Sequence, residues 1–163
     1  MRNLFSLLPS VTSEHEPAPA FHSCLRRIHR HPAFAREFLL SYKLPFIGNL
    51  HTSNYVELSH AFCKGFLEPL LELGITPNLL LLRRDPRRIA LSYLERYTAP
   101  ERTSYGIEFL LSPRDARLPP KPRWRSMTDY QLIFWYALEI ERRQREYSRL
   151  VRARGGGVCD VTP

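Results

Sequence analysis

The 163-residue sequence has few cysteines and no long apolar run. Its cysteines, Cys24, Cys63 and Cys159, are far apart and odd in number, so neither a disulfide framework nor a Cys-x-x-Cys zinc site is supported. A reducing compartment is therefore the default, and we expect a cytoplasmic location. No apolar stretch approaches the ~20 residues of a transmembrane helix. The apolar start of the chain is too short for a convincing signal peptide.

Lysine is scarce too, so the net charge of +8 comes almost entirely from arginine. Genome composition alone can produce such an excess, but a basic surface also suits nucleic acid, a membrane or an anionic small molecule. No DNA- or RNA-binding signature accompanies the charge, so nucleic acid is not the partner that we expect. The histidines His22, His29 and His31 lack zinc-site spacing with any cysteine or glutamate. We expect them at the surface, and we predict no metal.

Residues 78–93 are the most informative stretch of the chain. Four consecutive leucines, Leu79 to Leu82, predict a strand over 78–83 that is covered on both faces. Asp85 suits the N-cap of a following helix over 86–97, and Pro86 suits its first position. Arg84 is therefore expected at the carboxyl end of a strand and beside a helix N-terminus. Open α/β sheets bind ligands at this place, and helix N-termini favour anions.

The helix over 86–97 has a predicted inner face and a predicted outer face. Ile89, Tyr93 and Tyr97 recur at helical spacing and are expected in the core. Arg88 and Ser92 are four residues apart and share another face. Ser92 is thus expected to be available to a ligand.

The spacing of Arg84 and Ser92 resembles the 3′-phosphate-binding segment of sulfotransferases that use 3′-phosphoadenosine 5′-phosphosulfate (PAPS). In that family an apolar strand ends in Arg, a turn follows, and a Ser comes eight residues after the Arg, as it does here. The resemblance implies that Arg84 and Ser92 bind the 3′-phosphate of PAPS or of its product PAP. The alternative is an ordinary strand–helix junction with a basic turn.

The run from Pro9 to Pro17 gives a second resemblance. Val11 to Ser13 predicts a short strand, with residues 14–17 as a polar loop. Many sulfotransferases have a Pro-x-Val-type strand here that ends in a glutamate, which in several branches is the candidate base for the acceptor hydroxyl. Glu16 is the best match, because a carboxylate at the carboxyl end of a strand can accept that proton. The alternative is a solvated loop residue.

The remaining elements fall in the order that the same family implies. The Tyr55–Ser59 run is similar to a family segment, with Glu57 expected as a structural carboxylate and Lys64 as an exposed residue. In the first part of the chain, the patterns predict the end of a helix over 1–9, helical structure over 22–40 divided at Pro32, a loop over 44–53, a strand over 55–58, and a helix capped by Ser59 and closed by Gly74. Further along, they predict a Pro-rich lid or loop over 98–127 and a helix that runs from the Thr128–Gln131 capping box to about Arg154, with an exposed second half. A strand is predicted over 158–161.

The resemblance implies an α/β fold, a three-layer parallel sheet with helices on both faces, of the P-loop NTPase-like sulfotransferase type. Residues 1–163 would then form one incomplete domain that lacks the first strand and the C-terminal part. No Gly-x-x-Gly-x-Gly turn occurs anywhere in the sequence, although the family uses such a loop to hold the 5′-phosphosulfate. We therefore expect a fragment whose loop is encoded upstream, or a degenerate protein.

The expected function is transfer of a sulfuryl group from PAPS to a hydroxyl or amine of a small-molecule, glycan or peptide acceptor, with little activity in this chain. Arg84 and Ser92 are the expected nucleotide-binding residues, and Glu16 is the expected catalytic base. The alternative is a non-catalytic protein of the same fold that binds PAP-like nucleotides. A basic nucleic-acid module and a serine hydrolase receive less support, since neither has its motif here.

Overall fold

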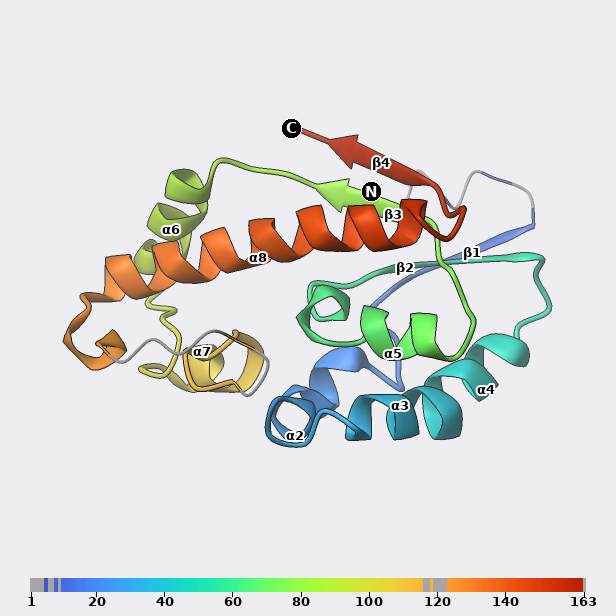
Figure 1. Ribbon diagram of the computed structural model, residues 1–163, viewed down its shortest axis with the longest axis horizontal. Helices are drawn as coiled ribbons and strands as arrows, with labels where there is room; N and C mark the ends of the chain where they lie inside the picture. The colour runs from blue at the N-terminus through green and yellow to red at the C-terminus, as the bar shows by residue number, and fades with distance from the viewer. Residues whose placement is uncertain (1–4, 6–7, 9, 116–117, 119–122, 163) are drawn as a thin grey trace. The chain divides into compact units, whose positions relative to one another are not determined.

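A computed structural model describes residues 5, 8, 10–115, 118 and 123–162 (Figure 1). The chain divides into two compact units, Met1–Pro69 and Leu70–Pro163. The described strands form two separate two-stranded sheets, β1–β2 and β3–β4, and both are parallel. The expected α/β class with parallel strands is therefore confirmed, and the single three-layer sheet stays a prediction. The helix expected over residues 1–9 lies largely outside the described residues.

The first unit contains the parallel pair β1–β2 and a series of short helices. The two strands pair in register from Val11 opposite Asn54 to His15 opposite Leu58, so both end at the same edge. The predicted strands at 11–13 and 55–58 are confirmed, and β1 continues through His15. The elements are β1 (Val11–His15), η1 (Phe21–Cys24), α2 (Leu25–Arg30), α3 (Phe34–Phe38), η2 (Leu39–Lys43), α4 (Leu44–Gly48), β2 (Asn54–Leu58), η3 (Phe62–Lys64) and α5 (Leu67–Glu72), which crosses the boundary between the units.

The core of the first unit is a cluster of phenylalanine rings. The ring of Phe21 lies 4.7 Å from that of Phe66 and 5.4 Å from that of Phe62, centroid to centroid. Phe38 approaches Phe66 at 5.6 Å. Tilted aromatic contacts of this kind stabilise a core beyond the area that they bury. The cluster fixes η1, α3 and η3 against one another.

Two predictions in the first unit were wrong. Residues 44–48 are helical rather than loop, because a π-helical turn at Leu39–Lys43 places Pro45 in the first turn of α4, where its missing N–H is tolerated. The helix expected from Ser59 to Gly74 is interrupted at Gly65, whose φ of +134° ends η3. The pattern of apolar residues continues through this break, so periodicity alone could not reveal it.

In the second unit a long helix, α8, contacts the parallel pair β3–β4 and the helix α6 (Figure 1). The pair runs in register from Leu79 opposite Val158 to Leu82 opposite Val161. The predicted strands, the Asp85 cap and the Thr128–Gln131 capping box are confirmed. The elements are β3 (Leu79–Leu82), α6 (Pro86–Glu95), α7 (Ser104–Phe109), η4 (Trp124–Ser126), α8 (Asp129–Arg152) and β4 (Val158–Val161).

Residues 98–127 are more ordered than a lid or loop where the structure describes them. Thr103 caps α7, and its side-chain oxygen accepts a hydrogen bond from the N–H of Gly106. Leu110, Leu111 and Leu118 are buried beside Tyr136 of α8 and form one core cluster. This segment therefore helps to build the core of the second unit.

Three burial predictions in the second unit were wrong. Leu80 and Leu82 are 46% and 47% exposed while Leu81 is buried, because α8 lies along the strand pair and covers one face of it. Tyr97 lies beyond the end of α6 and is exposed, whereas Ala90 is the buried residue of that helix. The expectation of an exposed second half of α8 was wrong at Arg143, which is buried and pairs with the buried Glu139, although Arg142 and Arg145 are exposed.

Candidate functional site

Arg84 lies where β3 ends and α6 begins, as predicted. The chain turns over three residues, and Asp85 caps α6 by accepting a hydrogen bond from the N–H of Arg87 at 2.7 Å. Ile89 then donates its N–H to the carbonyl of Asp85 and closes the first helical turn. Since the Asp85 carboxylate already occupies the helix N-terminus, an anion here would be bound by arginine side chains rather than by helix amides.

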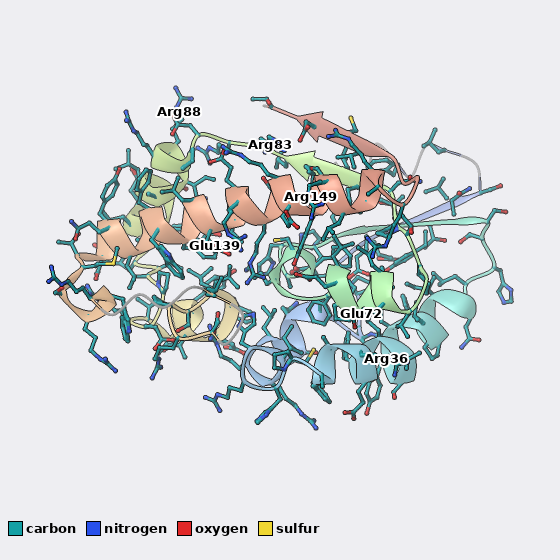
Figure 2. The ribbon with its side chains drawn as sticks, viewed as in Figure 1. Arg36, Glu72, Arg83, Arg88, Glu139 and Arg149 are labelled. Carbon is teal, nitrogen blue, oxygen red and sulfur yellow. The ribbon has the colours of Figure 1, made fainter. Side chains whose placement is uncertain are left out.

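The arginines around this turn differ in their partners. Arg83 binds Asp160 of β4, Nε to Oδ1 at 2.5 Å, so its charge is compensated across the strand pair (Figure 2). Arg84 and Arg88 are exposed, and neither forms an ion pair with any residue that the structure describes. Figure 2 shows Arg88 pointing outward from α6. Two uncompensated guanidinium groups thus flank the start of α6 and can bind an anion bidentately.

Ser92 belongs to the outer face of α6. At roughly 100° per residue, Ser92 and Arg88 fall about opposite Ala90, the residue of α6 that is buried. The Ser92 side chain is half-buried, and its contacts with the described residues include no hydrogen bond. Ser92 is therefore positioned beside Arg88, where a bound anion could accept a hydrogen bond from its hydroxyl.

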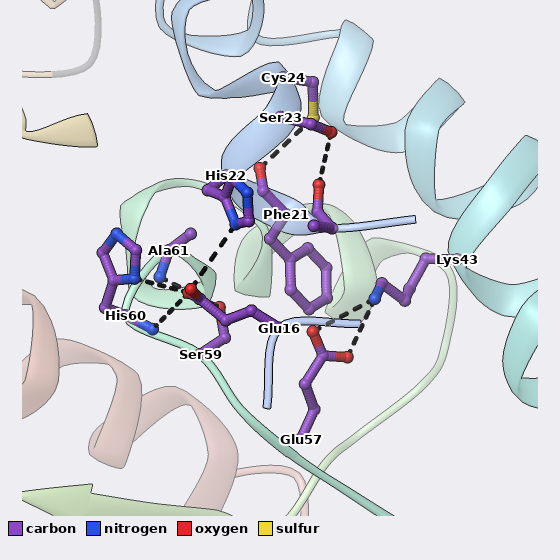
Figure 3. Close-up of polar contacts among 11 residues, drawn as sticks. Glu16, Phe21, His22, Ser23, Cys24, Lys43, Glu57, Ser59, His60 and Ala61 are labelled. Carbon is purple, nitrogen blue, oxygen red and sulfur yellow. Dashed lines mark hydrogen bonds and ion pairs between the residues drawn. The ribbon is translucent and has the colours of Figure 1, made fainter. Parts of the chain in front are cut away.

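Glu16 lies at the carboxyl edge of the β1–β2 pair, at the centre of a polar cluster (Figure 3). Its N–H donates to the carbonyl of Leu58 at 3.2 Å, and its φ of +49° is unusual for a residue other than glycine. Its Oε1 lies 2.5 Å from Nδ1 of His60 and accepts from Ser59 Oγ at 3.3 Å and from the N–H of His60 at 3.2 Å. Oε2 lies 3.6 Å from Nδ1 of His22.

His60 is the residue of this cluster best suited to accept a proton. Burial and the nearby positive charge of Lys64 lower the pKa of His60 below its ordinary value, and the opposing effect of Glu16 is smaller. At neutral pH the ring is therefore neutral, and Nδ1 donates its hydrogen to Glu16. Proton exchange would then involve Nε2 of a side chain that is 36% exposed. Glu16 itself holds several hydrogen bonds and is only 13% exposed, which suits a positioning role.

Glu57 of β2 carries a buried carboxylate with a structural role. Glu57 accepts hydrogen bonds from Nζ of Lys43 at 3.0 and 3.2 Å and from the hydroxyl of Tyr55 at 2.6 Å. Lys43 is 1% exposed, and its ammonium lies 4.5 Å from the centre of the Phe21 ring. Burial raises the pKa of Glu57 although Tyr55 and Lys43 act to lower it. The expectation of Glu57 as a structural carboxylate agrees with this arrangement.

The predicted site residues belong to different units of the chain. Glu16 belongs to the first unit, and Arg84 and Ser92 belong to the second. Sequence reasoning missed His60, although it follows the strand over 55–58 by two residues and parallel strands meet at one edge. It was also wrong about His29 and Lys64, which are buried at 8% and 1% exposure.

Comparisons with known proteins found no relative. No protein-family model, curated protein or solved structure matches this chain. Among the described residues, no His, Cys, Asp and Glu side chains gather in threes to hold a metal ion. Within the same residues, no helix has the length and apolar character needed to cross a membrane.

Proposed function

We propose that the chain is a sulfotransferase-like nucleotide-binding protein with the P-loop NTPase-like three-layer fold, and that PAPS or PAP binds at the start of α6. The observation that carries the proposal is the β3–Asp85–α6 junction. It presents two uncompensated arginines at the start of a capped helix, with a serine on the same face of that helix as Arg88. A terminal phosphate with two negative charges fits this combination of donors.

In this proposal Arg84 binds the 3′-phosphate through its guanidinium fork, and Ser92 donates a hydrogen bond to a phosphate oxygen. Arg88, on the same face as Ser92, adds positive charge. PAPS, when bound, supplies a sulfuryl group that an acceptor hydroxyl or amine can take, with PAP as the leaving group. The residues of the second unit therefore select a nucleotide that carries a 3′-phosphate.

The acceptor must lose a proton during transfer, and within the first unit the Glu16–His60 pair is able to accept a proton. Neutral His60 takes the proton at Nε2, and Glu16 orients the ring and stabilises the imidazolium that forms. Glu16 thus becomes a positioning residue, a change from the sequence-based expectation of Glu16 as the base. The sequence contains no glycine-rich phosphate loop, so we expect little or no turnover by the 163-residue chain. Rapid turnover with PAPS would contradict that expectation.

Calorimetric titration with PAP tests the site directly. We expect Arg84→Ala to weaken binding roughly 10- to 100-fold and Ser92→Ala about 2- to 10-fold, as is usual for charged and neutral hydrogen bonds. Arg152→Ala is the matched control, because it removes the same charge from the last turn of α8. The N–H of Leu79, the first residue of β3, donates a hydrogen bond to the carbonyl of Gly157, which follows the C-terminus of α8. Arg152 therefore lies near the start of β3, whereas Arg84 follows its end. Unchanged affinity in Arg84→Ala would refute the assignment.

A further inference from the structure

The first unit has a basic and aromatic pocket that neither site above uses. Its volume is about 750 Å³, within the range of small-molecule sites. It is lined along α2, α3 and η2, and none of its lining residues is an aspartate or glutamate. The lining residues that carry the argument are Arg26, Arg27, Arg30, Phe34, Phe38 and Tyr42.

The positive charge of the pocket comes from one helix. Arg26, Arg27 and Arg30 all belong to α2, at spacings of three and four residues that place them on neighbouring positions of its surface. Arg27 and Arg30 are exposed, and no carboxylate among the described residues forms an ion pair with either of them. The Cys24 thiol in the lining stays protonated at neutral pH, since burial raises its pKa to about 11. The pocket therefore concentrates charge that a ligand could neutralise.

The side chain of Arg27 is stacked on the aromatic ring of Phe34. The guanidinium carbon of Arg27 lies 3.5 Å from the centre of the Phe34 ring. This stacking uses the face of the guanidinium and leaves its N–H groups, which point outward in the plane, able to donate hydrogen bonds. Holding the side chain in place before binding lowers the entropy lost when a ligand is bound.

The remaining rings offer an apolar surface next to these donors. Phe38 and Tyr42 are one helical turn apart, with ring centroids 6.0 Å from each other. Phe38 is buried and belongs to the phenylalanine core, whereas Tyr42 is 54% exposed. A planar ring of a ligand can pack against Tyr42 and Phe34 while its charged group reaches the arginines.

We propose that this pocket binds an aromatic oxyanion, a small molecule that joins a ring to a phosphate, sulfate or carboxylate group. Arg27 and Arg30 of α2 bind the oxygens, and Phe34 and Tyr42 contact the ring. This site lies entirely in the first unit and does not depend on the nucleotide site at Arg84.

Calorimetry with phenyl phosphate tests the proposal in a chain that carries Arg84→Ala and Ser92→Ala, so that the nucleotide site does not contribute. We expect phenyl phosphate to bind more tightly than inorganic phosphate, which lacks the ring, and benzyl alcohol, which lacks the charge. Arg30→Gln should weaken phenyl phosphate binding roughly tenfold. Tyr42→Ala should weaken phenyl phosphate binding and leave inorganic phosphate binding unchanged.

Arg36→Gln is the matched control, because Arg36 is exposed on α3 but does not line the pocket. Arg27 and Arg30 also lie in the last turn of α2, where cations stabilise a helix. A purely structural role would lower thermal stability, followed by circular dichroism, without changing the preference among the three compounds. Equal weakening by Arg36→Gln, or equal binding of phenyl phosphate and inorganic phosphate, would overturn the proposal. Phenyl phosphate binding should be the same with and without Arg84→Ala and Ser92→Ala, which separates this test from that of the nucleotide site.

Discussion

The carboxylate of Glu16 lies between the two histidines His22 and His60, and this arrangement gives a direct prediction at the scale of single residues. The negative charge of Glu16 and its hydrogen bond both raise the pKa of His60, against the larger effect of burial. Glu16→Gln should therefore lower the pKa of His60 further below its ordinary value. A pH titration of the histidine resonances by NMR measures this change. Glu37→Gln, at an exposed position of α3, is the control, and a rise of the His60 pKa in Glu16→Gln would contradict the contact.

Two glycines of the first unit should respond to alanine in opposite directions. Gly65 has a φ of +134°, and an added Cβ would lie 3.3 Å from Cδ1 of Ile28, so Gly65→Ala should destabilise the protein by about 1–3 kcal/mol. Gly48 ends α4 with open space around it, so Gly48→Ala should stabilise by roughly 0.5–1 kcal/mol. Urea unfolding measures both changes. A loss of stability in Gly48→Ala similar to that in Gly65→Ala would contradict the strain at Gly65.

Single residues differ in how well the sequence predicted their surroundings. Asp85 and Thr128 were predicted correctly as caps, because capping depends on local hydrogen bonds between residues two or three apart. The partners of Glu16 and the burial of Lys43 were not predictable. They depend on strands that are 43 residues apart along the chain and meet only after folding.

At the scale of elements, α8 is stabilised by a buried ion pair that its charged sequence concealed. Burial raises the pKa of Glu139, but hydrogen bonds from Arg142 and Arg143 outweigh it and hold the pKa below its ordinary value. Glu139→Gln should cost roughly 3 kcal/mol at neutral pH, because Arg143 stays buried without its counter-charge. Glu146→Gln, which breaks an exposed pair with Arg149, should have no measurable effect.

The pH dependence of this difference has a definite sign. A carboxylate whose pKa is lower in the folded state stabilises the protein fully above its unfolded value, near 4.5, and loses this contribution as the pH falls through the folded value. The stability gap between the unaltered chain and Glu139→Gln should therefore narrow below pH 4.5. Chemical unfolding at pH 7 and in steps below pH 4.5 measures it, and a constant gap would contradict the ionised pair.

The positions of helices and strands were predicted well where they depend on local sequence patterns. The exposure of their side chains was predicted poorly, because it depends on packing between distant segments. The β3–turn–α6 stretch and the β4 strand follow from leucine runs, a cap and the glycines after α8. The second half of α8 was predicted to be exposed, because a run of arginines and glutamates resembles a solvated face. Glu139 and Arg143, four residues apart, form a buried ion pair, and the composition of the helix does not indicate which charged residues are buried.

At the scale of the whole molecule, each unit has its own core and its own candidate site. Phe21, Phe38, Phe62 and Phe66 pack together in the first unit. The second unit packs Ala90, Ala99 and Ile133 in one cluster and the leucines of residues 110–118 in another. The positions of the strands in each unit were predicted from the sequence, although only β3 is an apolar run. The division into two units was not, because residues 60–73 read as one continuous helix across the boundary.

Separate cores predict separate effects of core mutations. Phe66 is fully buried in the first unit, so Phe66→Ala should cost about 3–5 kcal/mol through the cavity that it leaves. Ile133→Ala is the matching change in the second unit, with an expected cost of about 2–5 kcal/mol. Hydrogen exchange measured on peptides by mass spectrometry should show faster exchange of β1 and β2 in the first variant and of β3 and β4 in the second. Equal acceleration of all four strands in both variants would mean that the chain unfolds as one cooperative unit, in which case the single domain predicted over residues 1–163 would be the better description.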